Sequence, residues 1–123
     1  MASCAYFSVE KGLLSIFNSA GQVVWHGMPD GLPVVDLRLA QDETSAVVLL
    51  DPPDGSGRIH NLVSISNAGA ILWRGQLPRD EASDAFVSLE MGTDSRVLAN
   101  TWSGYRLRLN PRSGRIEGQV PTK

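Results

Sequence analysis

The chain has 123 residues and a mass of 13.3 kDa, and 42% of its residues are hydrophobic and 20% charged. This is the size of one ordinary domain and the composition of a globular protein, which excludes a disordered or fibrous chain. The net charge is -2, with three basic and seven acidic side chains in residues 1–61 and eight basic and six acidic side chains in residues 62–123. We therefore expect a single domain over residues 1–123 with a dipolar surface.

The sequence predicts neither a membrane span nor a disulfide. The longest aliphatic run, residues 46–50, has five residues, whereas a membrane helix needs about 20. Glu10 and Lys11 interrupt the N-terminal region before the hydrophobic stretch of a signal peptide can form, and Cys4 is the only cysteine. These features favour the reducing environment of the cytoplasm.

Strand patterns run along the whole chain. Short segments rich in β-branched, aliphatic and aromatic residues alternate with turns of Gly, Pro, Asn, Asp and Ser, which predicts an all-β fold of antiparallel hairpins. A helix is expected for at most one turn near residues 79–84, because no longer window keeps apolar residues at helical spacing. The expected strands are residues 5–10, 13–18, 22–27, 33–40, 46–51, 59–66, 70–75, 85–91, 96–102, 105–110 and 115–120.

Part of this pattern repeats after 48 residues. Residues 20–27 and 68–75 both read Ala-Gly, then one residue, two apolar residues, Trp, one residue and Gly, so that Trp25 corresponds to Trp73. A third copy near the C-terminus keeps the turn glycine, Gly114, and has lost the tryptophan. A period of about 40 to 50 residues with four short strands is typical of a propeller blade.

Residues 65–73 and 109–116 resemble the strand, turn, glycine, strand and tryptophan core of pyrroloquinoline-quinone-type β-propeller repeats, and more loosely WD-type blades. The resemblance implies that the glycine takes the left-handed position of a hairpin and that Trp25 and Trp73 dock each blade on its neighbour. Enzymes of the quinone family hold their cofactor at the centre of a complete ring. Nothing in this chain matches those cofactor positions, so no cofactor is expected.

Counting strands predicts an incomplete ring. Eleven expected strands at four per blade make fewer than three blades, whereas a closed propeller needs at least about four. We therefore expect an open half-propeller of two to three antiparallel, four-stranded blades. Such a fold leaves an apolar blade face that must be covered or tolerated. This predicts a protein partner, which is either a second copy of the chain or a different protein.

The sequence shows no recognisable catalytic or metal-binding pattern. His26 takes the repeat position of Arg74, and His60 lies beside an expected turn, so neither has a neighbouring acid or the spacing of a Cys/His metal site. Residues 8–11 match Ser-x-x-Lys, but they lie in an expected strand and lack the companion motifs. Residues 51–57 lack the alternating oxygen ligands of a calcium loop. We expect a non-enzymatic protein without metal or cofactor.

Two groups of side chains are candidate binding surfaces. Acidic connectors on a β scaffold can mimic a polyanion and cover a basic cleft, although ordinary solubility explains them equally well. Arginines interleaved with aromatic residues can hold phosphates and stack bases, although a solvated strand face has the same pattern. The acidic group is Asp30, Asp42, Glu43, Asp54, Asp80, Glu81 and Asp84, and the basic group is Trp102, Tyr105, Arg106 and Arg108.

Three functional hypotheses follow. The first is a protein-binding module, in its most concrete form a cytoplasmic bacterial inhibitor of the immunity or antitoxin type, which binds a cognate toxin such as a nuclease and occludes its active site. The second is a self-assembling propeller that binds a small molecule or sugar. The third is nucleic-acid binding through Arg106 and Arg108.

Overall fold

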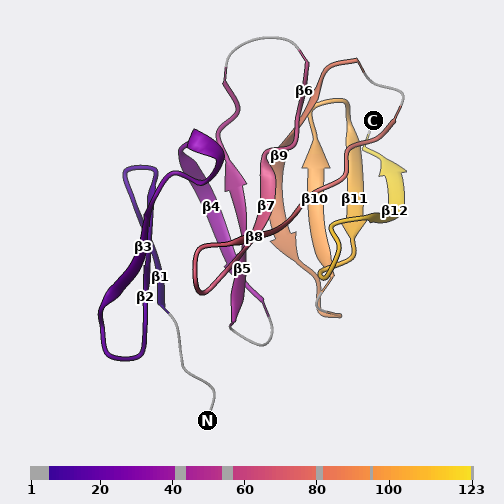
Figure 1. The fold of residues 1–123 in the computed structure, drawn as a ribbon. Coiled ribbons are helices and arrows are strands. Elements are labelled where there is room, and N and C mark those ends of the chain that lie inside the picture. The colour runs from indigo at the N-terminus through magenta and orange to yellow at the C-terminus, as the bar shows by residue number, and fades with distance from the viewer. Residues whose placement is uncertain (1–5, 41–43, 54–56, 80–81, 95, 123) are drawn as a thin grey trace.

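The computed structural model describes residues 6–40, 44–53, 57–79, 82–94 and 96–122. Three mainly antiparallel sheets stand side by side across the molecule (Figure 1). The observed strands agree closely with the expected ones, because each alternating segment ends at a turn residue. The all-β prediction is therefore confirmed.

The first sheet consists of β1 (Tyr6–Glu10), β2 (Leu13–Phe17) and β3 (Val23–Gly27), in that order. A 3-10 turn, η1 (Pro29–Gly31), leads into the second sheet. That sheet has the order β4 (Val34–Leu39), β5 (Ser45–Leu50), β7 (Leu62–Ser66) and β8 (Ile71–Arg74).

The third sheet has five strands. Four of them, β9 (Asp84–Met91), β10 (Val97–Thr101), β11 (Tyr105–Leu109) and β12 (Ile116–Pro121), form an antiparallel meander. The fifth is the two-residue strand β6 (Arg58–Ile59), which pairs in parallel with β9. The strand expected at residues 59–66 is thus divided between two sheets.

The expected helical turn near residues 79–84 does not form in the part of it that the structure describes, residues 79 and 82–84, while residues 80 and 81 lie outside the described residues. Asp84 is already the first residue of β9, because its backbone N–H donates to Gly57 O at 3.0 Å and it pairs in register with Arg58. The 3-10 turn forms instead at Pro29–Gly31, where proline sets the first backbone angle and Asp30 takes a left-handed φ of 53°.

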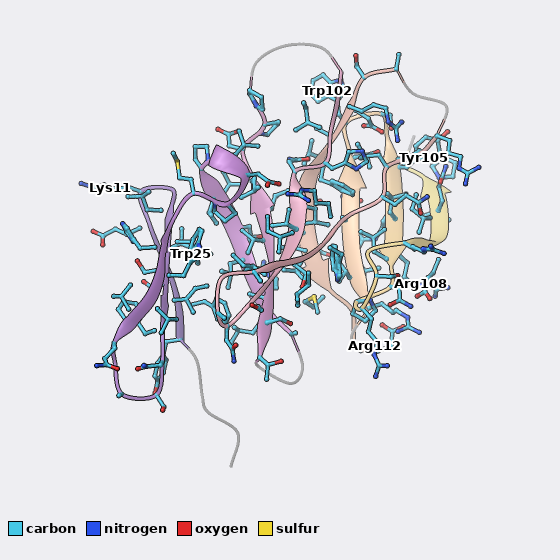
Figure 2. The ribbon with its side chains drawn as sticks, viewed as in Figure 1. Lys11, Trp25, Trp102, Tyr105, Arg108 and Arg112 are labelled. Carbon is cyan, nitrogen blue, oxygen red and sulfur yellow. The ribbon has the colours of Figure 1, made fainter. Side chains whose placement is uncertain are left out.

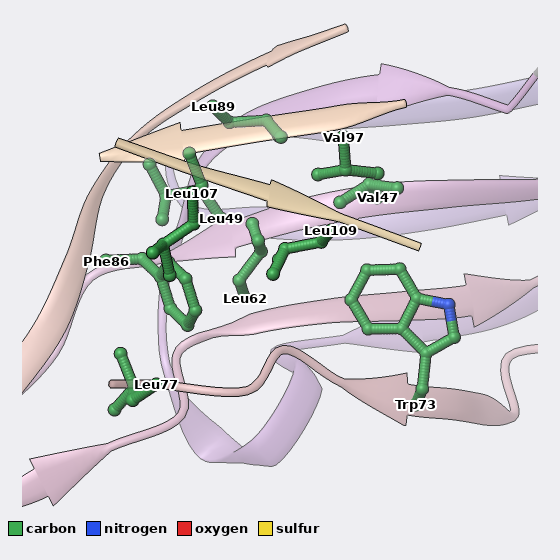
Figure 3. Close-up of a cluster of buried hydrophobic side chains, with 11 residues drawn as sticks. Val47, Leu49, Leu62, Trp73, Leu77, Phe86, Leu89, Val97, Leu107 and Leu109 are labelled. Atoms are coloured by element: carbon green, nitrogen blue, oxygen red, sulfur yellow. The ribbon is translucent and has the colours of Figure 1, made fainter. Parts of the chain in front are cut away.

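Two hydrophobic cores lie between the sheets, and the second sheet contributes to both. Alternation along β5 directs Ala46, Val48 and Leu50 toward the first sheet and Val47 and Leu49 toward the third. The first inter-sheet core consists of Leu14, Ile16, Val34, Ala46, Val48, Leu50, Val63 and Ile65. The second inter-sheet core consists of Val47, Leu49, Leu62, Trp73, Leu77, Phe86, Leu89, Val97, Ala99, Leu107 and Leu109 (Figure 3).

This stacking leaves two sheet faces without a neighbouring sheet, one at each end of the stack. A fully buried aliphatic side chain contributes about 1.5 to 3 kcal/mol to stability, so the two shared cores explain why the three sheets stay together. Among the described residues, no helix has the length and apolar character needed to cross a bilayer.

Candidate functional site

The acidic candidates do not form one described surface. Asp42, Glu43, Asp54, Asp80 and Glu81 lie outside the described residues. Only Asp30 and Asp84 have defined surroundings, and the structure places them in different roles.

Asp30 forms an ion pair with Arg74 that joins η1 to the end of β8. Arg74 Nε donates to Asp30 Oδ2 at 2.9 Å, and Arg74 Nη2 donates to Asp30 Oδ1 at 2.7 Å. These hydrogen bonds hold the pKa of the Asp30 carboxyl below its ordinary value, against a smaller opposing effect of burial. Asp30 is therefore occupied within the chain and links the connection between the first two sheets to the outer strand of the second.

Asp84 is not in a loop, contrary to the sequence prediction. It begins β9 and is 3% exposed. Its carboxylate accepts hydrogen bonds from the Ser103 hydroxyl at 2.7 Å and from the backbone N–H groups of Ser103 and Ala85 at 3.0 Å each. The side chain thus anchors the β10–β11 turn to the start of β9, and it is not presented at the surface.

The basic candidates lie on different parts of the third sheet. Arg106 and Arg108 project from one face of β11, while Tyr105 lies against the second inter-sheet core on the other face. Arg106 Nη2 donates to Glu90 Oε2 at 2.7 Å. Trp102 is 75% exposed in the β10–β11 turn, well away from Arg108 (Figure 2). The structure therefore does not bring Trp102, Tyr105 and the two arginines together.

The two repeat tryptophans each cover the turn glycine of the following repeat. Trp25 of β3 packs on Gly69 in the β7–β8 hairpin, where an added Cβ would overlap the indole. Trp73 of β8 packs on Gly114 in the β11–β12 hairpin, where an added Cβ would be 2.5 Å from Trp73 Cε3. Both glycines have positive φ. The docking role expected from the resemblance is therefore realised between consecutive sheets.

The corresponding glycine of the first repeat has no such cover. Gly21 has the same left-handed backbone, with φ of 80°, and nothing described lies within 4 Å of an added Cβ. At the other end of the stack, Gly118 stands at the repeat position of the tryptophans. The turn glycine of the first sheet is thus not covered by a described aromatic side chain, and the third sheet has no tryptophan at the position that covers such a glycine in the other repeats.

The outer face of the first sheet is formed by side chains that alternate with those of the first inter-sheet core. Ser8, Ser15 and His26 stand in one cross-strand row, and Ser15 Oγ lies 2.8 Å from His26 Nδ1. Among the described residues, no carboxylate forms a hydrogen bond with His26. The outward-facing side chains of this sheet include Tyr6, Ser8, Glu10, Leu13, Ser15, Phe17 and His26. All of these except Tyr6 line, together with Lys11, a hollow of about 320 Å³.

Asn61 is a structural residue that sequence reasoning missed. Its fully buried side chain donates from Nδ2 to Leu50 O and to Phe86 O, both at 2.8 Å, and accepts from Phe86 N–H at 2.7 Å. It therefore joins β5 of the second sheet to β9 of the third. A single asparagine inside an apolar strand pattern is the only signal that could have indicated this role.

The family comparison matches residues 34–120 with a domain of unknown function, DUF7957. This span is more than half of the chain. The chain belongs to the DUF7957 family. The matched span starts at β4 and ends within β12, so it contains the second and third sheets, and the first sheet precedes it.

Solved structures with a similar fold have little sequence identity to this DUF7957 chain. BamB from Moraxella catarrhalis gives a TM-score of 0.61 at 17% identity, over 99% of this chain and 35% of that one. The computationally designed Ika8 protein gives 0.58 at 14% identity, over 94% and 32%. Hsv2 from Kluyvelomyces marxianus gives 0.51 at 12% identity, over 95% and 41%.

The chain spans about a third of the length of the first two of these structures. At this identity the likeness concerns the fold alone, and it confirms the resemblance to propeller repeats and the open half-propeller architecture. No curated protein matches the chain. Among the described residues, no group of three His, Cys, Asp or Glu side chains could hold a metal ion.

Proposed function

We propose that this protein is a non-catalytic, cytoplasmic protein-binding module whose first sheet docks on a partner. The observation that carries the proposal is that the first sheet repeats the elements used for docking inside the fold but has no described neighbour on its outer side. Apolar side chains remain exposed there, with Tyr6 61% and Leu13 37% exposed. Exposed apolar side chains on an uncovered sheet face can contribute to an interaction site.

Among the described residues, the first sheet has one strand fewer than the second. By the repeat, β2 and β3 correspond to β7 and β8, so β1 corresponds to β5 and no described strand corresponds to β4. No described strand pairs with the other edge of β1. The main-chain groups of Tyr6–Glu10 on that edge can pair with an extended segment of a partner, as in binding by β-strand addition.

Gly21 indicates the side chain that such a partner supplies. Gly69 and Gly114 are both covered by an indole, whereas the flat surface over Gly21 is open. An aromatic side chain placed there would repeat the two contacts already made within the chain. We therefore propose that the partner presents an extended strand and an aromatic residue.

Self-assembly is less well supported by the same geometry. A head-to-tail pair would place the third sheet of one copy on the first sheet of the next, where a tryptophan is needed over Gly21. The third sheet has Gly118 at that repeat position. A different protein is therefore the better occupant. Nucleic-acid binding is also less well supported, because Arg106 is paired with Glu90 and Tyr105 faces away from both arginines.

In its finer form, we propose an inhibitor of the immunity type, which binds a toxic enzyme such as a nuclease and covers its active site. The open first sheet supports partner binding, and the acidic residues Asp42, Glu43, Asp54, Asp80 and Glu81 remain predicted contacts to a basic cleft. Binding through a rigid scaffold requires no catalytic group. This is consistent with the Ser15 and His26 pair, which has no hydrogen-bonded carboxylate among the described residues.

The test is affinity capture from the native host, followed by an activity assay of the captured protein. We expect one stoichiometric partner whose enzymatic activity falls when the complex forms. Tyr6→Asp with Leu13→Asp should abolish capture, because both charges lie on the outer face of the first sheet. Val120→Asp is the matched control, since Val120 is 55% exposed on the third sheet. Equal loss with both variants, or no partner with the wild type, would contradict the proposal.

A further inference from the structure

A second concave surface lies beside the third sheet, on the side that faces the second inter-sheet core. It is a groove of about 690 Å³ between the connector that follows β8 and the strands β11 and β12. Figure 1 shows this connector passing along the third sheet. Gln76 fixes it there, because Gln76 N–H donates to Gly114 O at 2.9 Å and Gln76 Oε1 accepts from Ile116 N–H at 2.9 Å.

The polar groups of the groove are mainly hydrogen-bond donors. Arg79 and Arg115 both line it and are exposed, and neither guanidinium has a hydrogen bond or ion pair with the described residues. Because Gln76 Oε1 is already occupied by Ile116, the amide Nε2 of Gln76 is the group left to act on a ligand. The Tyr105 hydroxyl and the Gln119 amide complete the polar wall.

The remaining wall is apolar and fixed. Leu77 and Pro78 are buried, and Ile116 and the Tyr105 ring pack against the second inter-sheet core. The connector cannot collapse into the groove, because the Gln76 backbone is tied to Gly114 and the Gln76 side chain is tied to the backbone of Ile116. A groove of this volume lies within the range of about 300 to 1,000 Å³ that is usual for small-molecule sites.

We propose that this groove binds a small organic anion that carries a doubly charged oxyanion, a phosphate monoester or a dicarboxylate, on an apolar body. Two guanidinium groups present planar pairs of donors that match the oxygens of such a group. The apolar wall of Leu77, Pro78 and Ile116 fits the body of the ligand. The site is separate from the outer face of the first sheet and does not depend on partner binding there.

The test is a two-dimensional amide NMR titration with three probes: phenyl phosphate, phenylsuccinate and the neutral phenyl glucoside. We expect at least one anion to cause saturable shifts confined to the groove, including the amides of Leu77, Ile116 and Gln119. Phenyl glucoside should cause no comparable shifts, because it lacks charge. The anion that binds more tightly shows whether the groove prefers a phosphate or a dicarboxylate.

Arginine variants test whether the anion binds in this groove. Arg79→Gln and Arg115→Gln should each weaken binding by at least about fivefold, because each removes a charge-assisted donor pair. Arg108→Gln removes the same charge from the other face of β11 and should change binding by less than about twofold. Absence of saturable shifts with both anions, or equal weakening by Arg108→Gln, would overturn the proposal.

Discussion

The indole of Trp73 packs against Gly114, the turn glycine of the next sheet. An added Cβ on Gly114 would be 2.5 Å from Trp73 Cε3, and Trp73 Nε1 donates to Pro111 O at 2.9 Å in the same hairpin. Trp25 and Gly69 make the equivalent contact one sheet earlier. The Ala-Gly…Trp repeat thus reflects a contact between successive sheets. Within one repeat, the glycine contacts the preceding sheet and the tryptophan contacts the following sheet.

Replacing the covered glycine should cost more stability than replacing the uncovered one. Gly21→Ala should destabilise by about 1 to 2 kcal/mol, which is the cost of a left-handed alanine. Gly114→Ala adds a steric overlap with the indole and should destabilise by about 2 to 5 kcal/mol in total. Urea unfolding measures both values, and equal effects of the two variants would show that the Trp73 contact is unimportant.

Trp73→Phe should isolate the indole hydrogen bond. Phenylalanine keeps an aromatic ring over Gly114 but cannot donate to Pro111 O, so we expect a loss of about 1 to 3 kcal/mol, including a small cavity term. Trp73→Ala should cost more, about 3 to 5 kcal/mol. Thermal unfolding followed by circular dichroism separates the two. A phenylalanine variant as unstable as the alanine variant would mean that the hydrogen bond, rather than the ring, fixes the hairpin.

Asn61→Leu should destabilise the junction between the second and third sheets. The substitution leaves Phe86 N–H and two backbone carbonyls without their side-chain partner in a buried site, which should cost at least about 2 kcal/mol. Asn67→Leu is the control, because the Asn67 side chain makes no hydrogen bond with the described residues. The free energy of unfolding in urea gives both effects. An unchanged free energy of unfolding in Asn61→Leu would mean that the two sheets do not need the Asn61 hydrogen bonds.

Asp30→Asn should reveal a pH-dependent contribution to stability. The pKa of Asp30 is lowered in the folded state by hydrogen bonds from Arg74. The pair therefore stabilises the fold above the unfolded pKa of about 3.9, and its contribution disappears as the pH falls through and below that value. Asparagine tolerates the left-handed backbone at this position, so the substitution mainly removes the charge.

At pH 7 the Asp30→Asn variant should be less stable than the wild type by under about 1 kcal/mol, because the pair is partly exposed and screened. The difference should shrink when both proteins are unfolded in urea at about pH 3. High salt should reduce the difference at pH 7 as well. A difference independent of pH would assign the effect to backbone preference instead of charge.

Much of the fold was predictable from the sequence because its signals are local. Short runs rich in β-branched and aliphatic residues, such as 46–50 and 62–66, mark strands, and glycines such as Gly21, Gly69 and Gly114 mark hairpins with left-handed turns. The repeat of Trp25 and Trp73 then predicts stacked blades. The break at His60 and Asn61 was not predictable, since it depends on which strand of another sheet lies beside the chain.

The candidate sites were less predictable, because a binding surface depends on the faces that strands present to each other. Asp84 appeared to be a loop acid, yet pairing with residue 58 draws it into β9, where the Ser103 backbone and hydroxyl satisfy it. Tyr105 lies with Arg79 and Arg115 instead of with Arg106, because alternation along β11 separates neighbours in sequence.

The sequence by itself determined the all-β class and the positions of most strands, and it limited the blades to two or three, because periodicity and turn residues act over a few positions. Only the tertiary structure decided which surfaces remain open. Burial is collective: the tryptophan over Gly114 comes from the preceding repeat, and the bare surface over Gly21 exists because no described part of the chain lies there. That vacancy, rather than any motif, is the basis of the proposed partner binding.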